Sequence, residues 1–147
     1  MKNISRRIVN GVIVVCAALG IFSLATLSHS IMGPAKDAIR RIDAADQDTI
    51  LAACRQIMNE RPQYTNDLDP TVTWMEEWVT VKRGSHDYRR RLPAAVRDLN
   101  PYWVLIGTDQ VVVSVNPIPA RVYLRAFSPK AKQFGSRKLI DGLWIQN

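Results

Sequence analysis

The chain has 147 residues, of which 47% are apolar, and its formal net charge is +7. This length suits one domain of ordinary size beside a short leader or anchor, and it leaves little room for a second domain. Three of the positive charges, Lys2, Arg6 and Arg7, precede an apolar stretch and are typical of an export signal. The remaining charge is mildly basic, so nucleic-acid binding is not expected.

From Ile8 to Leu27, twenty consecutive residues carry no charge, and fifteen of them are apolar. At a rise of about 1.5 Å per residue, a helix of this length spans the roughly 30 Å hydrocarbon core of a bilayer. The sequence therefore predicts a short basic tail at residues 1–7, a transmembrane or signal-anchor helix at 8–32, and an extracytoplasmic domain at 33–147.

The orientation of this segment follows from its flanking charges. Lys2, Arg6 and Arg7 adjoin the apolar stretch, whereas the first basic residue on the other side, Lys36, lies nine residues past Leu27. Positive charge favours the cytoplasmic side. We expect a single-pass membrane protein with a cytoplasmic N-terminus and a periplasmic or extracellular domain. The alternative is a secreted protein, cleaved after the small-x-small site Ser23-Leu24-Ala25.

The outer domain begins with a predicted amphipathic helix over residues 35–61. Its apolar positions recur at helical spacing. The alternative is a break at residues 46–49, with Asp46 as the N-cap of a second helix, and Pro62 ends the helix in either case. Cys54 lies on the apolar side, which favours a buried thiol over a disulfide between chains. The following region is mixed: a strand at 71–74, and a segment at 75–81 that suits either a short helix or an edge strand.

The remaining chain predicts a basic loop at 82–91, a two-turn helix at 93–99 and then a sheet. Residues 102–106 and 111–115 form a predicted hairpin, residues 121–127 alternate as a half-buried strand, and residues 139–145 are a final strand that brings Trp144 to the core. The predicted fold class is α+β, with the long amphipathic helix packed on a small antiparallel sheet of three or four strands.

No motif for catalysis, a cofactor or a metal is evident, so none of the three is expected. His86 and Asp87 are adjacent and are interpreted as solvated loop residues, because a zinc site needs three or four ligands and a nucleophile needs a base and an orienting group. The alternative is a small secreted enzyme that uses His86 with Asp87, Glu76 or Tyr88.

One group of basic residues with aromatic neighbours stands out in the outer domain. It is either a solvated surface or a patch for an anionic partner: lipid headgroups, an acidic protein or a cell-surface polymer. The leading hypothesis is a membrane-anchored protein with a non-catalytic binding domain, and an accessory subunit of a larger membrane complex is a further alternative. The candidate patch comprises Lys82, Arg83, Arg89, Arg90, Arg91 and Arg97.

Overall fold

The structure is a computed structural model that describes residues 33–67, 77–116 and 121–146. Pro34–Asn147 form one compact unit. The predicted membrane segment at 8–32 and the predicted strand at 71–74 lie outside the described residues. Within the described ranges, no helix is both long enough and apolar enough to cross a bilayer.

The amphipathic stretch forms two helices, which is the alternative with a break capped by Asp46 and not one continuous helix over 35–61. Residues 33–44 are helical, and α2 follows over Gln47–Asn59. The Asp46 carboxylate accepts hydrogen bonds from Asp48 N at 3.1 Å, Thr49 N at 3.4 Å and Thr49 Oγ1 at 2.6 Å. These bonds, chiefly the one from the Thr49 hydroxyl, hold the pKa of Asp46 below its usual range. A 3-10 turn, η1, occupies Arg61–Gln63 after α2 ends.

The sheet is larger than the sequence predicted, since the described residues contain six strands rather than three or four. All neighbouring strands are antiparallel, in the order β1-β2-β3-β4-β6-β5. The strands are β1 Val79–Lys82, β2 Trp103–Ile106, β3 Gln110–Asn116, β4 Val122–Phe127, β5 Arg137–Ile140 and β6 Leu143–Gln146.

Two places account for the undercount. One is β1, at the end of the segment 75–81 that suited either a short helix or an edge strand. The other is at the C-terminal end of the sheet. A single strand was predicted at 139–145, but a turn at Asp141 and Gly142 divides this region into β5 and β6. Gly142 has φ +90°, a conformation that glycine adopts readily. The turn also sets which side chains of β6 are buried: Leu143 and Ile145 face the core, whereas Trp144 is only half-buried, contrary to expectation.

The predicted basic loop at 82–91 is also partly wrong. It contains α3, His86–Arg90, whose N-cap Ser85 accepts a hydrogen bond at Oγ from Tyr88 N at 3.3 Å. The helix predicted over 93–99 is present in shorter form as α4, Ala94–Arg97. A five-residue helix has too few positions to show an apolar period, which explains why the sequence pattern missed it.

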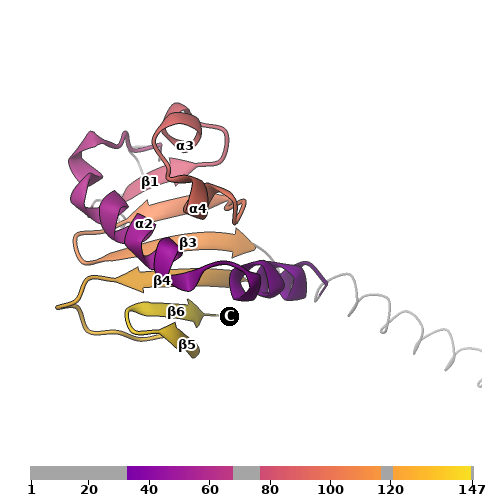
Figure 1. Ribbon diagram of the computed structural model, residues 1–147. Helices are drawn as coiled ribbons and strands as arrows, with labels where there is room; N and C mark the ends of the chain where they lie inside the picture. The colour runs from indigo at the N-terminus through magenta and orange to yellow at the C-terminus, as the bar shows by residue number, and fades with distance from the viewer. Residues whose placement is uncertain (1–32, 68–76, 117–120, 147) are drawn as a thin grey trace, which may run out of the picture. The chain divides into compact units, whose positions relative to one another are not determined.

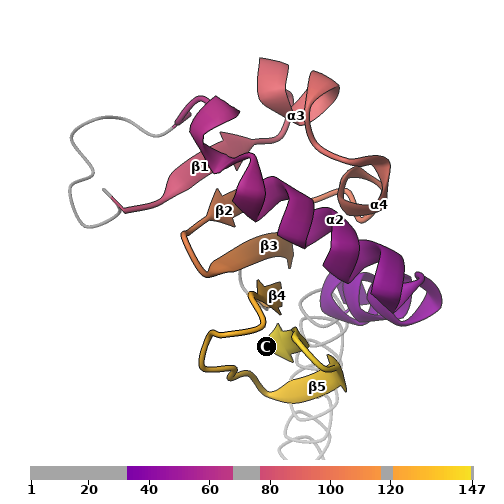
Figure 2. The ribbon, with the colours of Figure 1, turned by 60° about the vertical axis from the view of Figure 1, so that its left-hand side comes forward.

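The helices lie on one side of the sheet, and this arrangement confirms the α+β class (Figures 1 and 2). Helix α2 contacts β3, β4 and β5, and α3 contacts the edge strand β1. Cys54 is fully buried between α2 and the sheet, and burial raises the pKa of its thiol to about 12. Its largest fully buried companions include Ile42, Ile50, Ile57, Ile106, Leu124 and Leu143.

Candidate functional site

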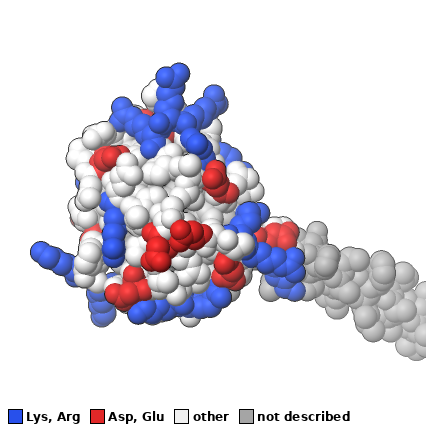
Figure 3. All heavy atoms as spheres, in the orientation of Figure 1, with Lys and Arg blue, Asp and Glu red and all other residues white. Residues whose placement is uncertain are grey.

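The six residues of the predicted cationic patch have different surroundings in the structure. Figure 3 shows Lys and Arg atoms grouped at the top of the molecule, at the position of α3 in Figure 1. Among the described residues, no carboxylate forms an ion pair with Lys82, Arg89 or Arg90, and all three are exposed. These three residues, the α3 cationic group, are therefore available to a partner.

Two other arginines of the patch support the local fold. Arg97 donates from Nη1 to the Arg89 carbonyl at 3.1 Å, which connects α4 to α3. Arg91 lies with Nε 3.3 Å from Asp87 Oδ1. The Tyr64 hydroxyl donates to the Arg91 carbonyl at 3.2 Å. These contacts fix the C-terminal end of α3 against the segment that follows η1.

Asp87 is buried and contacts Thr65, His86 and Arg91, so its interpretation as a solvated loop residue is wrong. It is only 4% exposed, and its Oδ2 accepts a hydrogen bond from Thr65 N at 2.6 Å. Burial opposes ionisation of the carboxyl, but the bonds from Thr65 and His86 and the charge of Arg91 outweigh it. The pKa of Asp87 therefore lies below its usual range.

His86 has the exposed position that the sequence predicted. Its side chain is 71% exposed, with Nδ1 3.3 Å from Asp87 Oδ1. The Asp87 carboxylate also serves Thr65 and Arg91, so this pair is built into a structural contact. Glu76 lies outside the described residues. Tyr88 is buried and belongs to the hydrophobic core cluster.

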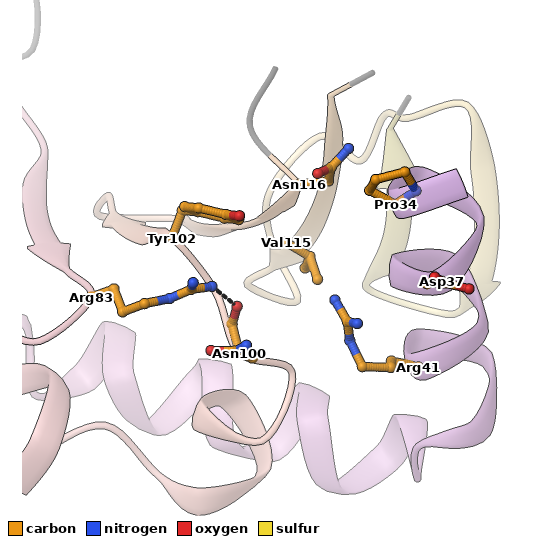
Figure 4. Close-up of a pocket in the computed structure, with 8 residues that line it drawn as sticks. All are labelled: Pro34, Asp37, Arg41, Arg83, Asn100, Tyr102, Val115 and Asn116. Atoms are coloured by element: carbon orange, nitrogen blue, oxygen red, sulfur yellow. Dashed lines mark hydrogen bonds between the residues drawn. The ribbon is translucent and has the colours of Figure 1, made fainter. Parts of the chain in front are cut away.

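The remaining patch residue, Arg83, belongs to a separate feature, a cavity of about 260 Å³ at one end of the sheet (Figure 4). The helix at 33–44 supplies one wall at successive turns, with Pro34, Asp37 and Arg41 on the same side. The turn after β1, the segment before β2 and the end of β3 supply the rest: Arg83, Asn100, Tyr102, Val115 and Asn116.

Strand register brings Arg83 to this cavity. Arg83 N donates to the Tyr102 carbonyl at 2.9 Å, and Tyr102 N donates to the Ser114 carbonyl at 2.8 Å, so the pairing of β1, β2 and β3 continues past the strand ends. The Arg83 guanidinium lies 4.0 Å from the centre of the Tyr102 ring. It also donates from Nε to the Pro101 carbonyl at 2.9 Å and from Nη2 to the Asn100 carbonyl.

Arg41 approaches from the opposite wall. Figure 4 shows its guanidinium directed from the helix into the cavity, toward Val115 and facing the side from which Arg83 enters. No hydrogen bond or ion pair joins the Arg41 guanidinium to another described residue. Asp37 is the acidic member of the lining, and it lies 3.7 Å from Arg40, which is outside the lining.

The two guanidiniums of this lining supply hydrogen-bond donors and positive charge that can bind an anion. Across the described part of the chain, no group of three or more His, Cys, Asp or Glu residues is placed to hold a metal ion. The one described cysteine, Cys54, is buried in the core, away from this lining.

The sequence pattern singled out Arg83 but not Arg41 and Tyr102, which also line the cavity. It placed Arg41 on the polar side of a helix and Tyr102 in a strand. No local pattern links positions 41, 83 and 102, because only the packing of the helix at 33–44 on the sheet brings them together. No family model, curated protein or solved structure matches this chain.

Proposed function

We propose that this protein is a single-pass membrane-anchored protein whose extracytoplasmic α+β domain binds an anionic partner without catalysing a reaction. The anchor is the uncharged stretch from Ile8 to Leu27, preceded by Lys2, Arg6 and Arg7. The N-terminus is cytoplasmic, and the domain at 33–147 lies outside.

The observation that carries the binding role is the α3 cationic group. Lys82, Arg89 and Arg90 are exposed and have no carboxylate ion-pair partner among the described residues. Fixed positive charge of this kind steers an anionic partner and selects it against neutral ones. The contacts of Asp87 with Thr65 and Arg91 also support this binding role, because they hold α3, which carries Arg89 and Arg90, in place.

The anchor is tested by carbonate extraction of membranes from cells that express the full chain. An integral helix holds the protein in the membrane pellet, because alkaline carbonate removes peripheral proteins but leaves apolar spans in lipid. N-terminal sequencing of the same material gives the intact start if the segment is retained. Release into the supernatant, or a mature start near residue 26, contradicts the anchor.

The binding surface is tested by charge reversal with a matched control. The variant Arg89→Glu/Arg90→Glu is compared with Lys130→Glu/Lys132→Glu, which makes the same charge change on an exposed loop far along the chain. Partners are recovered by cross-linking and mild-detergent purification at low and high salt. We expect a several-fold loss in the first variant alone, and equal recovery from both variants contradicts the assignment of this surface.

A further inference from the structure

We propose that the cavity between the helix at 33–44 and the end of the sheet binds the phosphodiester group of an anionic phospholipid in the adjoining membrane. This inference rests on the membrane anchor proposed above. It assigns a ligand class to a second site, separate from the α3 cationic group. The juxtaposition that supports it is that of Arg41 and Arg83, which enter one cavity from opposite walls (Figure 4).

The cavity is sized for a compact group. Its volume of about 260 Å³ falls below the roughly 300–1,000 Å³ of pockets that enclose larger small molecules. Val115 and Asn116 are 2% and 8% exposed and form its inner surface, while Tyr102 is 42% exposed at its rim. The tetrahedral phosphodiester group can therefore enter the cavity while the rest of the lipid stays outside.

Arg83 is pre-organised for this role. Two hydrogen bonds to the carbonyls of Asn100 and Pro101, together with the stacking on Tyr102, fix the plane of its guanidinium. No hydrogen bond to another described residue uses the Nη1 donors of Arg83. Asn100 has φ +55°, a left-handed conformation that asparagine tolerates better than most residues. A donor held in place before binding loses little conformational entropy when the ligand arrives.

The charge of the lining favours a monoanion. Two arginines and Asp37 leave one net positive charge. A phosphodiester carries one negative charge shared by two non-bridging oxygens, which two guanidiniums can bind from opposite sides. Asp37 repels the second charge of a free phosphate dianion. Phosphatidylglycerol suits this lining because its headgroup has no ammonium group, so no positive charge of the lipid compensates the phosphodiester that the arginines would bind.

Chain connectivity supports a ligand in the membrane. The proposed span ends at residue 32, and Pro34, the first residue of the lining, follows two positions later. At no more than about 3.6 Å per residue, Pro34 lies within roughly 7 Å of the end of the span. The headgroup layer on each side of the hydrocarbon core is of similar depth, about 5–7 Å. The lining therefore begins where phosphodiesters are most concentrated.

The test uses the full chain, purified in neutral detergent and titrated with phosphatidylglycerol, with bound lipid counted by native mass spectrometry. Arg41→Gln removes the unpaired guanidinium, and Arg40→Gln removes the same charge from the neighbouring residue outside the lining. We expect about a tenfold weaker affinity for Arg41→Gln, the typical effect of losing one charged hydrogen-bond donor, and a change below about twofold for Arg40→Gln. Arg41→Lys, which keeps the charge but loses the planar fork, is expected to lie between them.

Competing ligands distinguish the sources of the phosphodiester. Inorganic phosphate and a soluble glycerol-phosphate polymer are added to the same titration. Equal affinity for phosphatidylglycerol in Arg41→Gln and Arg40→Gln overturns the site. A soluble ligand that binds more tightly than phosphatidylglycerol, and displaces it, overturns the assignment to the membrane. Circular dichroism confirms that the variants are folded. A protein that stays in the carbonate-washed pellet but shows no effect at Arg41 refutes the lipid site and leaves the proposed anchor intact.

Discussion

At the scale of single residues, Asp87 shows how a buried charge is retained in a small domain. An ionised carboxylate in the interior is costly unless hydrogen bonds and opposite charge compensate it. Thr65 N supplies the shortest bond at 2.6 Å, and Arg91 and His86 each approach to 3.3 Å. The result is a connection between the segment after η1 and helix α3, two parts of the chain that share no regular secondary structure.

Replacing Asp87 with asparagine therefore destabilises the domain. We expect Asp87→Asn to lower the free energy of unfolding by about 2 kcal/mol, since the amide keeps an acceptor for Thr65 but faces Arg91 with no charge. Urea denaturation of the full chain in neutral detergent, followed by tryptophan fluorescence, measures the change. Asp98→Asn, at an exposed position, is the control and should match the wild type; a similar loss in both variants contradicts the role of Asp87.

The lowered pKa of Asp87 also predicts how the stability of the domain changes with pH. The pKa of Asp87 is lower in the folded protein than its usual value of about 3.9. Its contribution is therefore present above about pH 4 and is lost as the pH falls through the folded value. We expect the stability difference between wild type and Asp87→Asn to narrow below pH 4. A difference that stays constant from pH 7 to pH 3 is the contrary result.

Cys54 illustrates the opposite case, a titratable group that burial makes inert. Its thiol pKa is raised to about 12, so only about one molecule in ten thousand carries the thiolate at pH 8. In a Cys16→Ala background, a disulfide reagent should leave Cys54 unmodified in the native protein and modify it fully in denaturant. Lys130→Cys in the same background provides an exposed thiol for comparison, and equal rates at positions 54 and 130 contradict the buried position.

At the scale of elements, the β5–β6 hairpin depends on one glycine. Gly142 has φ +90°, and a Cβ there would lie 3.1 Å from Arg55 Nη2 and 3.5 Å from the methyl groups of Leu51. Gly84 in the turn after β1 has a similar φ of +84°, but its nearest neighbour would be an Arg89 atom at 3.9 Å. The two positions therefore separate the cost of backbone strain from the cost of contact with α2.

We expect both alanine variants to be destabilised, and Gly142→Ala more than Gly84→Ala. The left-handed backbone costs each variant about 1 kcal/mol, and the contact with Arg55 and Leu51 adds roughly 1 kcal/mol at position 142. Urea midpoints of the two variants give the comparison. Equal losses at the two positions would show that α2 yields to the added methyl group without cost.

At the scale of the whole molecule, the domain has helices on one side of its sheet (Figure 1). Lys and Arg atoms gather at the position of α3 (Figure 3), and two further arginines, Arg41 and Arg83, line the cavity at one end of the sheet. In the proposed topology, Pro34 follows the end of the span at residue 32 by two positions. The α3 cationic group is separated from Pro34 by more than forty positions in the chain. The proposed lipid site and the proposed partner surface are therefore built from different parts of the domain.

The orientation of the anchor can be measured with single cysteines in the Cys16→Ala background. A membrane-impermeant maleimide should label Lys130→Cys in intact spheroplasts, because the proposed topology places the domain outside. It should label Ser5→Cys only after the membrane is permeabilised. Cys54 adds no signal, since it is buried. The reverse labelling pattern contradicts the cytoplasmic N-terminus.

Local physical chemistry decided much of the fold at the sequence level. The N-cap at Asp46, the apolar period of α2, the hairpin of β2 and β3 and the alternation of β4 each depend on residues close together in the chain. The α+β class follows from their order. The weaker signals failed where an element was too short to show a period, as in α3, or where one glycine turned a single apolar run into two strands, as at Gly142.

The site was decided by tertiary packing. From the sequence, Arg41 and Arg83 were members of separate polar segments, and Asp87 was a loop carboxylate beside a histidine. Arg41 and Arg83 share a cavity only because apolar burial docks the helix at 33–44 on the sheet, and Asp87 gains partners only because Tyr64 and Thr65 pass next to α3. Burial and strand register determine which distant side chains meet, and neither is a property of any short stretch of residues.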